Sequence, residues 1–139
     1  MAQLIEFTNH HLALVGAFVA VLAALLASLR QGGGLAISSA RAVQLLNQQD
    51  AVAVDIRSEK SFRAGHIINA VHATPEEITA GAEKLARYRE RPVIVYCDRG
   101  LTSVASAKAL RRAGFPQAWS LQGGVEGWRH DGLPLRGSR

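Results

Sequence analysis

The chain has 139 residues, which is enough for one domain of ordinary size and a short additional element. Its single cysteine excludes an intramolecular disulfide framework and a cysteine-rich zinc site, and we expect no metal. The formal net charge is +5, but the arginines are scattered and form no basic run, so we expect no nucleic-acid partner. A basic surface beside an anionic membrane explains the charge equally simply.

One long uncharged stretch dominates the amino-terminal part of the chain. Residues 12–29 read LALVGAFVAVLAALLASL and would span about 27 Å as a helix, close to the hydrocarbon thickness of a bilayer. A cleaved signal peptide is the alternative, but no lysine or arginine precedes Leu12. We therefore expect a tail (1–11), a transmembrane helix (12–29), a flexible glycine-rich linker (30–36) and a folded domain (37–139).

The charges that flank this stretch predict its orientation. Glu6 precedes it, whereas Arg30 and Arg41 follow it. Because basic residues favour the cytoplasmic side, we expect a single-pass inner (plasma) membrane protein with its amino terminus outside and its domain in the cytoplasm. A reduced cytoplasm also suits an unpaired thiol.

From residue 37 onward, helical patterns alternate with short apolar runs. The run TPEEITAGAEKLARYRE is the strongest helix prediction, since Thr74 can cap it and Pro75 suits its first position. Helices are predicted over 40–49, with Ser38 or Ser39 as the cap, and over 74–90, 103–114 and 125–132, while 58–67 is predicted as a short polar helix or turn. Strands are predicted over 51–56, 92–96 and 117–121.

This alternation predicts an α/β fold: a parallel sheet with helices on both faces, preceded by the one transmembrane helix. In such sheets the ligand site lies beyond the carboxyl ends of the strands. The strand that ends at Tyr96 is followed directly by Cys97, so we expect the thiol at that edge.

The segment after Tyr96 has the composition of an anion-binding loop. Its residues are Cys97, Asp98, Arg99, Gly100, Leu101 and Thr102. A short loop that curls into a helix amino terminus points several backbone N–H groups inward, and Gly100 allows the curl. A sulfur at the centre of such a loop is favoured as thiolate, the nucleophilic form. The alternative is that Cys97 is an inert buried thiol.

Three segments in this order resemble the single-domain rhodaneses, a family of sulfurtransferases. They are VDIRSEKSFRAGHIINAVH, VIVYCDRGLTSVASAKALRRAGF and LQGGVEGWRHDGLPL, and the resemblance covers about residues 37 to 135. It implies a rhodanese-like fold. The amino-terminal stretch is similar to that of bacterial rhodaneses with a single-pass anchor.

The resemblance also implies an activity and a set of site residues. Cys97 would take the outer sulfur of a donor such as thiosulfate or a protein persulfide, and would pass it from its own persulfide to a thiol acceptor. Asp98, Arg99, Gly100, Leu101 and Thr102 would bind the substrate, with no cofactor. Asp55 and Arg57 would pair near the site and hold a loop.

Two departures from the family pattern leave alternatives open. Many members carry arginine where Thr102 stands, and Asp98 places a negative charge beside the thiol, which opposes thiolate formation. A phosphatase of the Cys-x5-Arg kind needs an arginine at the position of Ser103 and is disfavoured. The remaining alternative is a non-catalytic adaptor that binds a membrane protein partner at the cytoplasmic face, where the lipid bilayer would be the other contact.

Overall fold

The computed structural model describes residue 6 and residues 11–137 of the chain. The chain forms two compact units, Met1–Gly34 and Leu35–Arg139. Each of these units has its own internal structure, and the second one contains the single cysteine.

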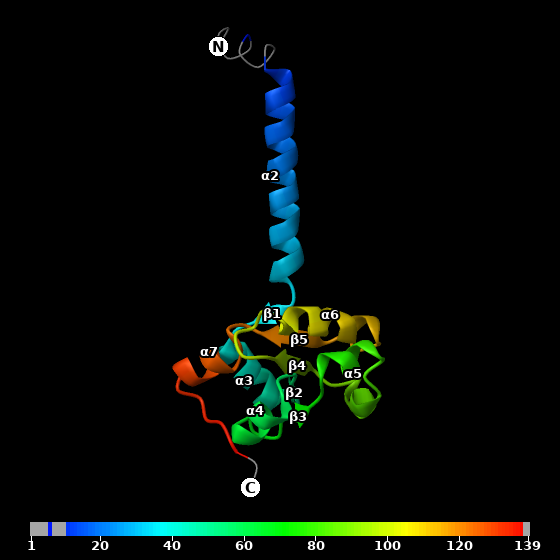
Figure 1. The fold of residues 1–139 in the computed structure, drawn as a ribbon, viewed down its shortest axis with the longest axis vertical. Coiled ribbons are helices and arrows are strands. Elements are labelled where there is room, and N and C mark those ends of the chain that lie inside the picture. The colour runs from blue at the N-terminus through cyan, green and yellow to red at the C-terminus, as the bar shows by residue number, and fades with distance from the viewer. Residues whose placement is uncertain (1–5, 7–10, 138–139) are drawn as a thin grey trace. The chain divides into compact units, whose positions relative to one another are not determined.

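Among the described residues, the first unit contains the helix α2 (Leu12–Gly33), which continues through four residues that we expected in the flexible linker (Figure 1). Within the described residues, no helix is both long enough and apolar enough to cross a membrane. The predicted transmembrane helix over 12–29 and the single-pass inner-membrane localisation are therefore wrong. An uncharged stretch is necessary for a bilayer span, but its lack of charge does not by itself make one.

The second unit is built on one parallel sheet of five strands in the order β1-β5-β4-β2-β3 (Figure 1). The strands are β1 (Ala36–Ile37), β2 (Val52–Asp55), β3 (Val71–His72), β4 (Val93–Tyr96) and β5 (Ala118–Leu121). The three central strands confirm the predicted ones. Parallel pairing brings Asp55 beside Tyr96, so the carboxyl ends of β2 and β4 meet at one edge.

Helices cover both faces of this sheet, as predicted. They are α3 (Ser39–Gln48), α4 (Glu59–Ala64), α5 (Pro75–Thr79), the 3₁₀ helix η1 (Glu83–Tyr88), α6 (Ser103–Arg112) and α7 (Gly124–His130). One buried cluster joins the sheet to α5, η1 and α6 through Ile78, Leu85 and Leu110. The other joins the opposite face to α3 and α7 through Leu45 and Trp128.

The predicted helix over 74–90 is wrong in its continuity. It begins as expected, with the Thr74 and Glu77 side chains forming a reciprocal capping box, but it ends at Thr79 and resumes as the 3₁₀ helix. Gly81 and Ala82 have φ values of 118° and 55°, outside the helical region. Ile78 before the break and Leu85 after it both pack in the same buried cluster.

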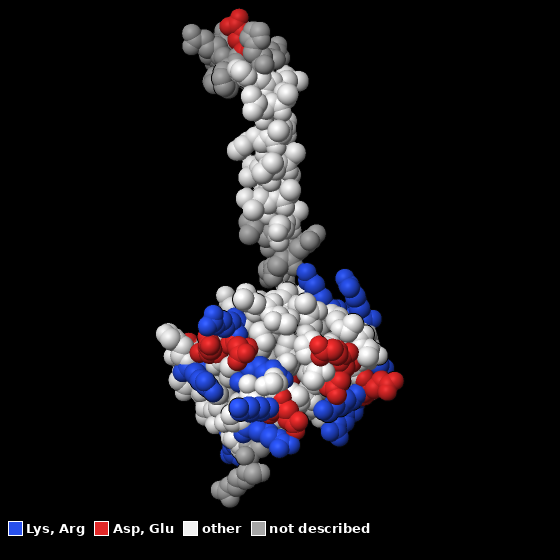
Figure 2. Space-filling view, viewed as in Figure 1, with Lys and Arg blue, Asp and Glu red and all other residues white. Residues whose placement is uncertain are grey.

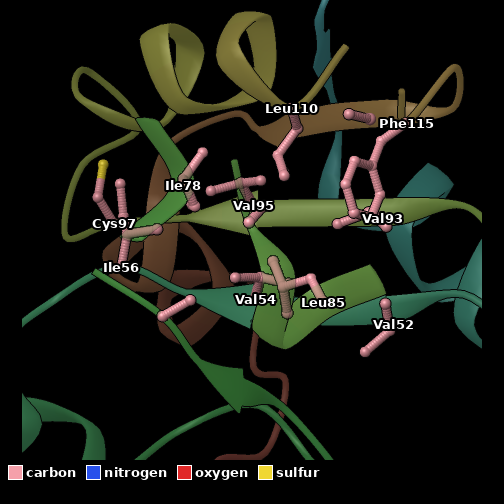
Figure 3. Close-up of a cluster of buried hydrophobic side chains, with 13 residues drawn as sticks. Val52, Val54, Ile56, Ile78, Leu85, Val93, Val95, Cys97, Leu110 and Phe115 are labelled. Carbon is pink, nitrogen blue, oxygen red and sulfur yellow. The ribbon is translucent and has the colours of Figure 1, made fainter. Parts of the chain in front are cut away.

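The alternation of side chains along β4 determines which face of the sheet Cys97 points to. Val93 and Val95 of β4 point into the cluster beneath α6, and Cys97 continues this series two residues later (Figure 3). Side chains two residues apart share a face of a strand. The thiol therefore lies at the end of a core-facing row and at the carboxyl edge of the sheet.

Charged side chains of both signs are mixed over the second unit. On the face drawn in Figure 2, blue basic and red acidic groups alternate and neither forms a continuous field. On that face, basic and acidic groups are thus interspersed.

Candidate active site

The sulfur of Cys97 is held by two groups of the loop and of the helix that follows. The Gly100 backbone N–H donates to Sγ at 3.1 Å, and Sγ lies 3.5 Å from the Ser103 hydroxyl oxygen. Ser103 is the first residue of α6 and is fully buried. Its hydroxyl is hydrogen-bonded to the equally buried Ser120 hydroxyl of β5 at 2.8 Å.

These contacts decide the ionisation of the thiol. Burial alone raises the pKa of Cys97, but hydrogen bonds from the Ser103 hydroxyl and from the backbone N–H groups of Ser103, Gly100 and Thr102 outweigh it. The result is a pKa of Cys97 below its ordinary value. A thiolate is therefore present at a lower pH than in a free cysteine, and it is the nucleophilic form.

We expect alkylation of Cys97 by iodoacetamide to show this shift directly. Because the pKa of the folded thiol is lowered, the rate should reach half of its maximum at a pH below about 8.5, the pKa of a free cysteine. The measurement is the rate against pH for the folded chain. The control is the same chain unfolded in urea, whose alkylation midpoint should equal that of free cysteine. Equal midpoints for the folded and the unfolded chain would contradict the lowered pKa.

An open pocket of about 400 Å³ lies in front of the sulfur. It is lined by Cys97, Asp98, Arg99, Leu101, Thr102 and Glu126. The loop thus brings together all but one of the predicted loop residues, and the exception, Gly100, contacts the sulfur through its amide. Leu101 is 82% exposed, which places an apolar side chain at the rim.

Charged side chains at the rim are paired with one another. Arg99 Nε lies 3.3 Å from Glu126 Oε2, and both side chains are exposed. Asp98 is 69% exposed at its side chain, and its carboxylate lies 4.0 Å from Arg57 Nη1. Our sequence reasoning did not find Glu126, which lies 29 residues from Cys97 and reaches the pocket only through α7.

The amino terminus of α7 supports the loop from behind. Val125 N–H donates to the Cys97 carbonyl at 2.9 Å, and Glu126 N–H donates to the Asp98 carbonyl at 3.0 Å. Gly124 precedes them with φ of 58°, and a Cβ there would lie 2.6 Å from the Asp98 carbonyl carbon. The close approach of α7 to the loop therefore requires glycine at this position.

Gly124→Ala should lower the free energy of unfolding by about 2–3 kcal/mol, because the added Cβ combines a left-handed backbone with a collision against the loop carbonyls. Urea unfolding measures the loss. The matched control is Gly132→Ala, which has φ of 74° but open space around the new Cβ, and which should cost about 1 kcal/mol. Equal losses would show that the loop does not resist the added atom.

Asp55 and Arg57 form a buried ion pair next to this loop. Arg57 Nη2 donates to Asp55 Oδ2 at 2.7 Å and to the Gly65 carbonyl at 2.6 Å, and the two side chains are 0% and 6% exposed. Burial lowers the pKa of Arg57, but the bond to Asp55 outweighs it and the pKa of Arg57 is raised. The pair joins the end of β2 to the segment after α4.

The described part of the chain offers neither a metal cluster nor a stronger candidate pocket. Among the described residues, no group of three or more histidine, cysteine, aspartate or glutamate side chains is placed to hold a metal ion. A cavity of about 450 Å³ lies between α3, the start of β2 and residues 133–134. It has a largely apolar lining without Cys97, so the smaller pocket carries the reactive group.

Comparison with known proteins agrees with this architecture. The family model named rhodanese-like domain matches residues 38–131. The chain belongs to the rhodanese-like family. The matched residues include β2 to β5, the loop after β4 and the supporting helix α7.

Individual relatives place the chain within this rhodanese-like family. It is 35% identical to the uncharacterized protein YibN of Escherichia coli K12, with 97% of each chain covered. It is 37% identical to the thiosulfate sulfurtransferase GlpE of Coxiella burnetii over 67% of this chain and 85% of GlpE. The crystal structure of a Pseudomonas aeruginosa thiosulfate sulfurtransferase shares the fold, with 24% identity and a TM-score of 0.62 over 75% of this chain and 20% of that one.

Proposed function

We propose that this rhodanese-like chain is a sulfurtransferase that moves sulfane sulfur through a persulfide on Cys97. One observation carries the proposal: the Cys97 sulfur accepts a hydrogen bond from the Gly100 N–H, beside the Ser103 hydroxyl, and faces an open pocket. A nucleophile that is activated in this way and accessible to substrate is what sulfur transfer needs. The similarity to thiosulfate sulfurtransferases supports the same reaction class.

The first half-reaction consumes a sulfur donor such as thiosulfate. The Cys97 thiolate attacks the outer sulfur and forms a new S–S bond, while the S–S bond of thiosulfate breaks and sulfite leaves with its electron pair. In the second half-reaction, a thiolate or cyanide attacks the outer sulfur of the persulfide, and the Cys97 thiolate leaves. No net oxidant or reductant is needed.

The loop residues have different roles in this proposal. The N–H groups of Gly100, Thr102 and Ser103 stabilise the negative charge that returns to Cys97 in each cycle. Asp98 and Arg99 form a rim of mixed charge and Leu101 offers an apolar contact, a combination that suits a protein persulfide as well as a small anion. A phosphatase of the Cys-x5-Arg kind would have its clamping arginine at position 103, which is here a serine that hydrogen-bonds to Ser120.

Mass spectrometry of the full chain tests the proposed function. After incubation with thiosulfate, or with a cysteine desulfurase and its substrate, Cys97 should gain the mass of one sulfur atom, and cyanide should remove it. A thiol that stays free with every donor would contradict the proposal and favour a non-catalytic adaptor.

A further inference from the structure

Behind the reactive thiol, two buried hydroxyls continue the line of hydrogen bonds away from the pocket. Ser103 Oγ lies between Cys97 Sγ at 3.5 Å and Ser120 Oγ at 2.8 Å. Ser103 and Ser120 are both 0% exposed, so water does not reach either of them. Ser120 comes from β5, which pairs with β4 on the side opposite to β2.

The direction of this chain of hydroxyls is set at its buried end. Within the described residues, Ser103 Oγ is the hydrogen-bond partner of the Ser120 hydroxyl and there is no second one. A hydroxyl donates one proton, and a buried donor without an acceptor is costly. The Ser120 hydroxyl therefore donates its hydrogen bond to Ser103 Oγ.

The consequence passes through Ser103 to the sulfur. When Ser103 Oγ accepts from Ser120, the Ser103 proton is free to point at Cys97 Sγ, and hydrogen bonds in such a chain strengthen one another. In the reverse arrangement, the S–H of Cys97 donates to Ser103 and the Ser103 hydroxyl donates to Ser120. The Ser120 proton then has no acceptor. The arrangement thus matches a sulfur that accepts, and a thiolate accepts more strongly than a thiol.

We propose that Ser120 is a positioning residue for sulfur transfer: its buried hydroxyl donates to Ser103 and thereby directs the Ser103 proton to the sulfur of Cys97. Ser120 touches neither the sulfur nor the pocket and acts through Ser103. The inference rests on the proposed role of Cys97 as the nucleophile.

Iodoacetamide alkylation of the full chain across a range of pH tests this role without any sulfur donor. Failure of the proposed function and failure of this inference therefore give different results. In Ser120→Ala, the midpoint should move to higher pH, and the rate below the midpoint should fall about threefold, as expected for weakening one hydrogen bond. A midpoint that moves to lower pH would show the opposite direction of donation and overturn the proposal, as would an unchanged midpoint.

A double-mutant cycle separates positioning from simple packing. Ser103→Ala should slow alkylation more than Ser120→Ala does, and the double variant should behave like Ser103→Ala alone, because Ser120 acts through Ser103. Additive effects of the two substitutions would contradict the proposal. Urea unfolding of each variant checks that the fold is retained.

Two further variants complete the design. Ser120→Thr keeps the hydroxyl and should retain the midpoint of the unsubstituted chain; a shift as large as that of Ser120→Ala would contradict the proposal. Ser106→Ala is the matched control, since Ser106 is a buried serine of α6 that has no hydrogen bond to the sulfur among the described contacts. It should leave the alkylation profile unchanged, and an equal shift there would assign the effect to general packing.

Discussion

Cys97→Ser should reduce sulfur transfer from thiosulfate to cyanide by at least about 1,000-fold. A serine hydroxyl at this position is not ionised at neutral pH and cannot form the persulfide that links the two half-reactions. Formation of thiocyanate measures the rate, and mass spectrometry measures the sulfur bound to the chain. Because Cys97 is the only cysteine, no other thiol of the chain can replace it.

The fold should survive this substitution. Serine is slightly smaller than cysteine, and its oxygen can accept from the Gly100 N–H that contacts the sulfur at 3.1 Å. Circular dichroism and the urea midpoint are therefore the controls for Cys97→Ser, with Cys97→Ala as a second variant that lacks any acceptor. Transfer above a few per cent of the original rate in both variants would exclude the persulfide mechanism.

Arg57→Ala should lower the free energy of unfolding by about 3–5 kcal/mol, the largest effect on stability that we expect from a single substitution here. The substitution leaves the Asp55 carboxylate, which is 0% exposed, without its charged partner. It also removes the donor to the Gly65 carbonyl at 2.6 Å. Urea unfolding at neutral pH measures the loss.

An exposed arginine–carboxylate pair provides the control. Arg63 and Glu59 lie 2.6 Å apart, but their side chains are 68% and 66% exposed. Because water and ions screen such a pair, Arg63→Ala should cost about 0.5 kcal/mol or less. If Arg57→Ala and Arg63→Ala lowered the free energy of unfolding by similar amounts, burial would not be the reason for the stabilising effect of the Asp55–Arg57 pair.

Local patterns in the sequence were sufficient for the central sheet. The runs that became β2, β4 and β5 are short and apolar, as strands buried on both faces must be. The strands β1 and β3 were missed because each has two residues, and their pairing with β5 and β2 defines them more than their own composition does. The break after Thr79 was also missed, because the capping at Thr74 marks where a helix begins and not where it ends; Gly81, with φ of 118°, was the local signal of the break.

The candidate site was only partly accessible from the sequence. The position of Cys97 at a strand end and a loop with inward N–H groups follow from neighbouring residues, so both were predicted. The Gly100 N–H is one of these inward groups. Ser120 and Glu126 were not, because 23 and 29 residues of chain separate them from the cysteine. A serine inside the apolar run AWSL was the signal for Ser120, since a polar residue on a buried strand needs a buried partner.

The sequence by itself determined the alternation of strands and helices, and with it the parallel sheet that puts the thiol at a carboxyl edge. These features depend on periodicity and on capping, which act over a few residues. The tertiary structure decided which groups surround the sulfur: Ser120 from β5 lies behind it, and α7 supports its loop. Within the described residues, the structure also contains no helix long and apolar enough for the membrane span that the uncharged amino-terminal stretch suggested. Contacts between distant segments depend on how whole elements pack, and a local pattern does not specify them.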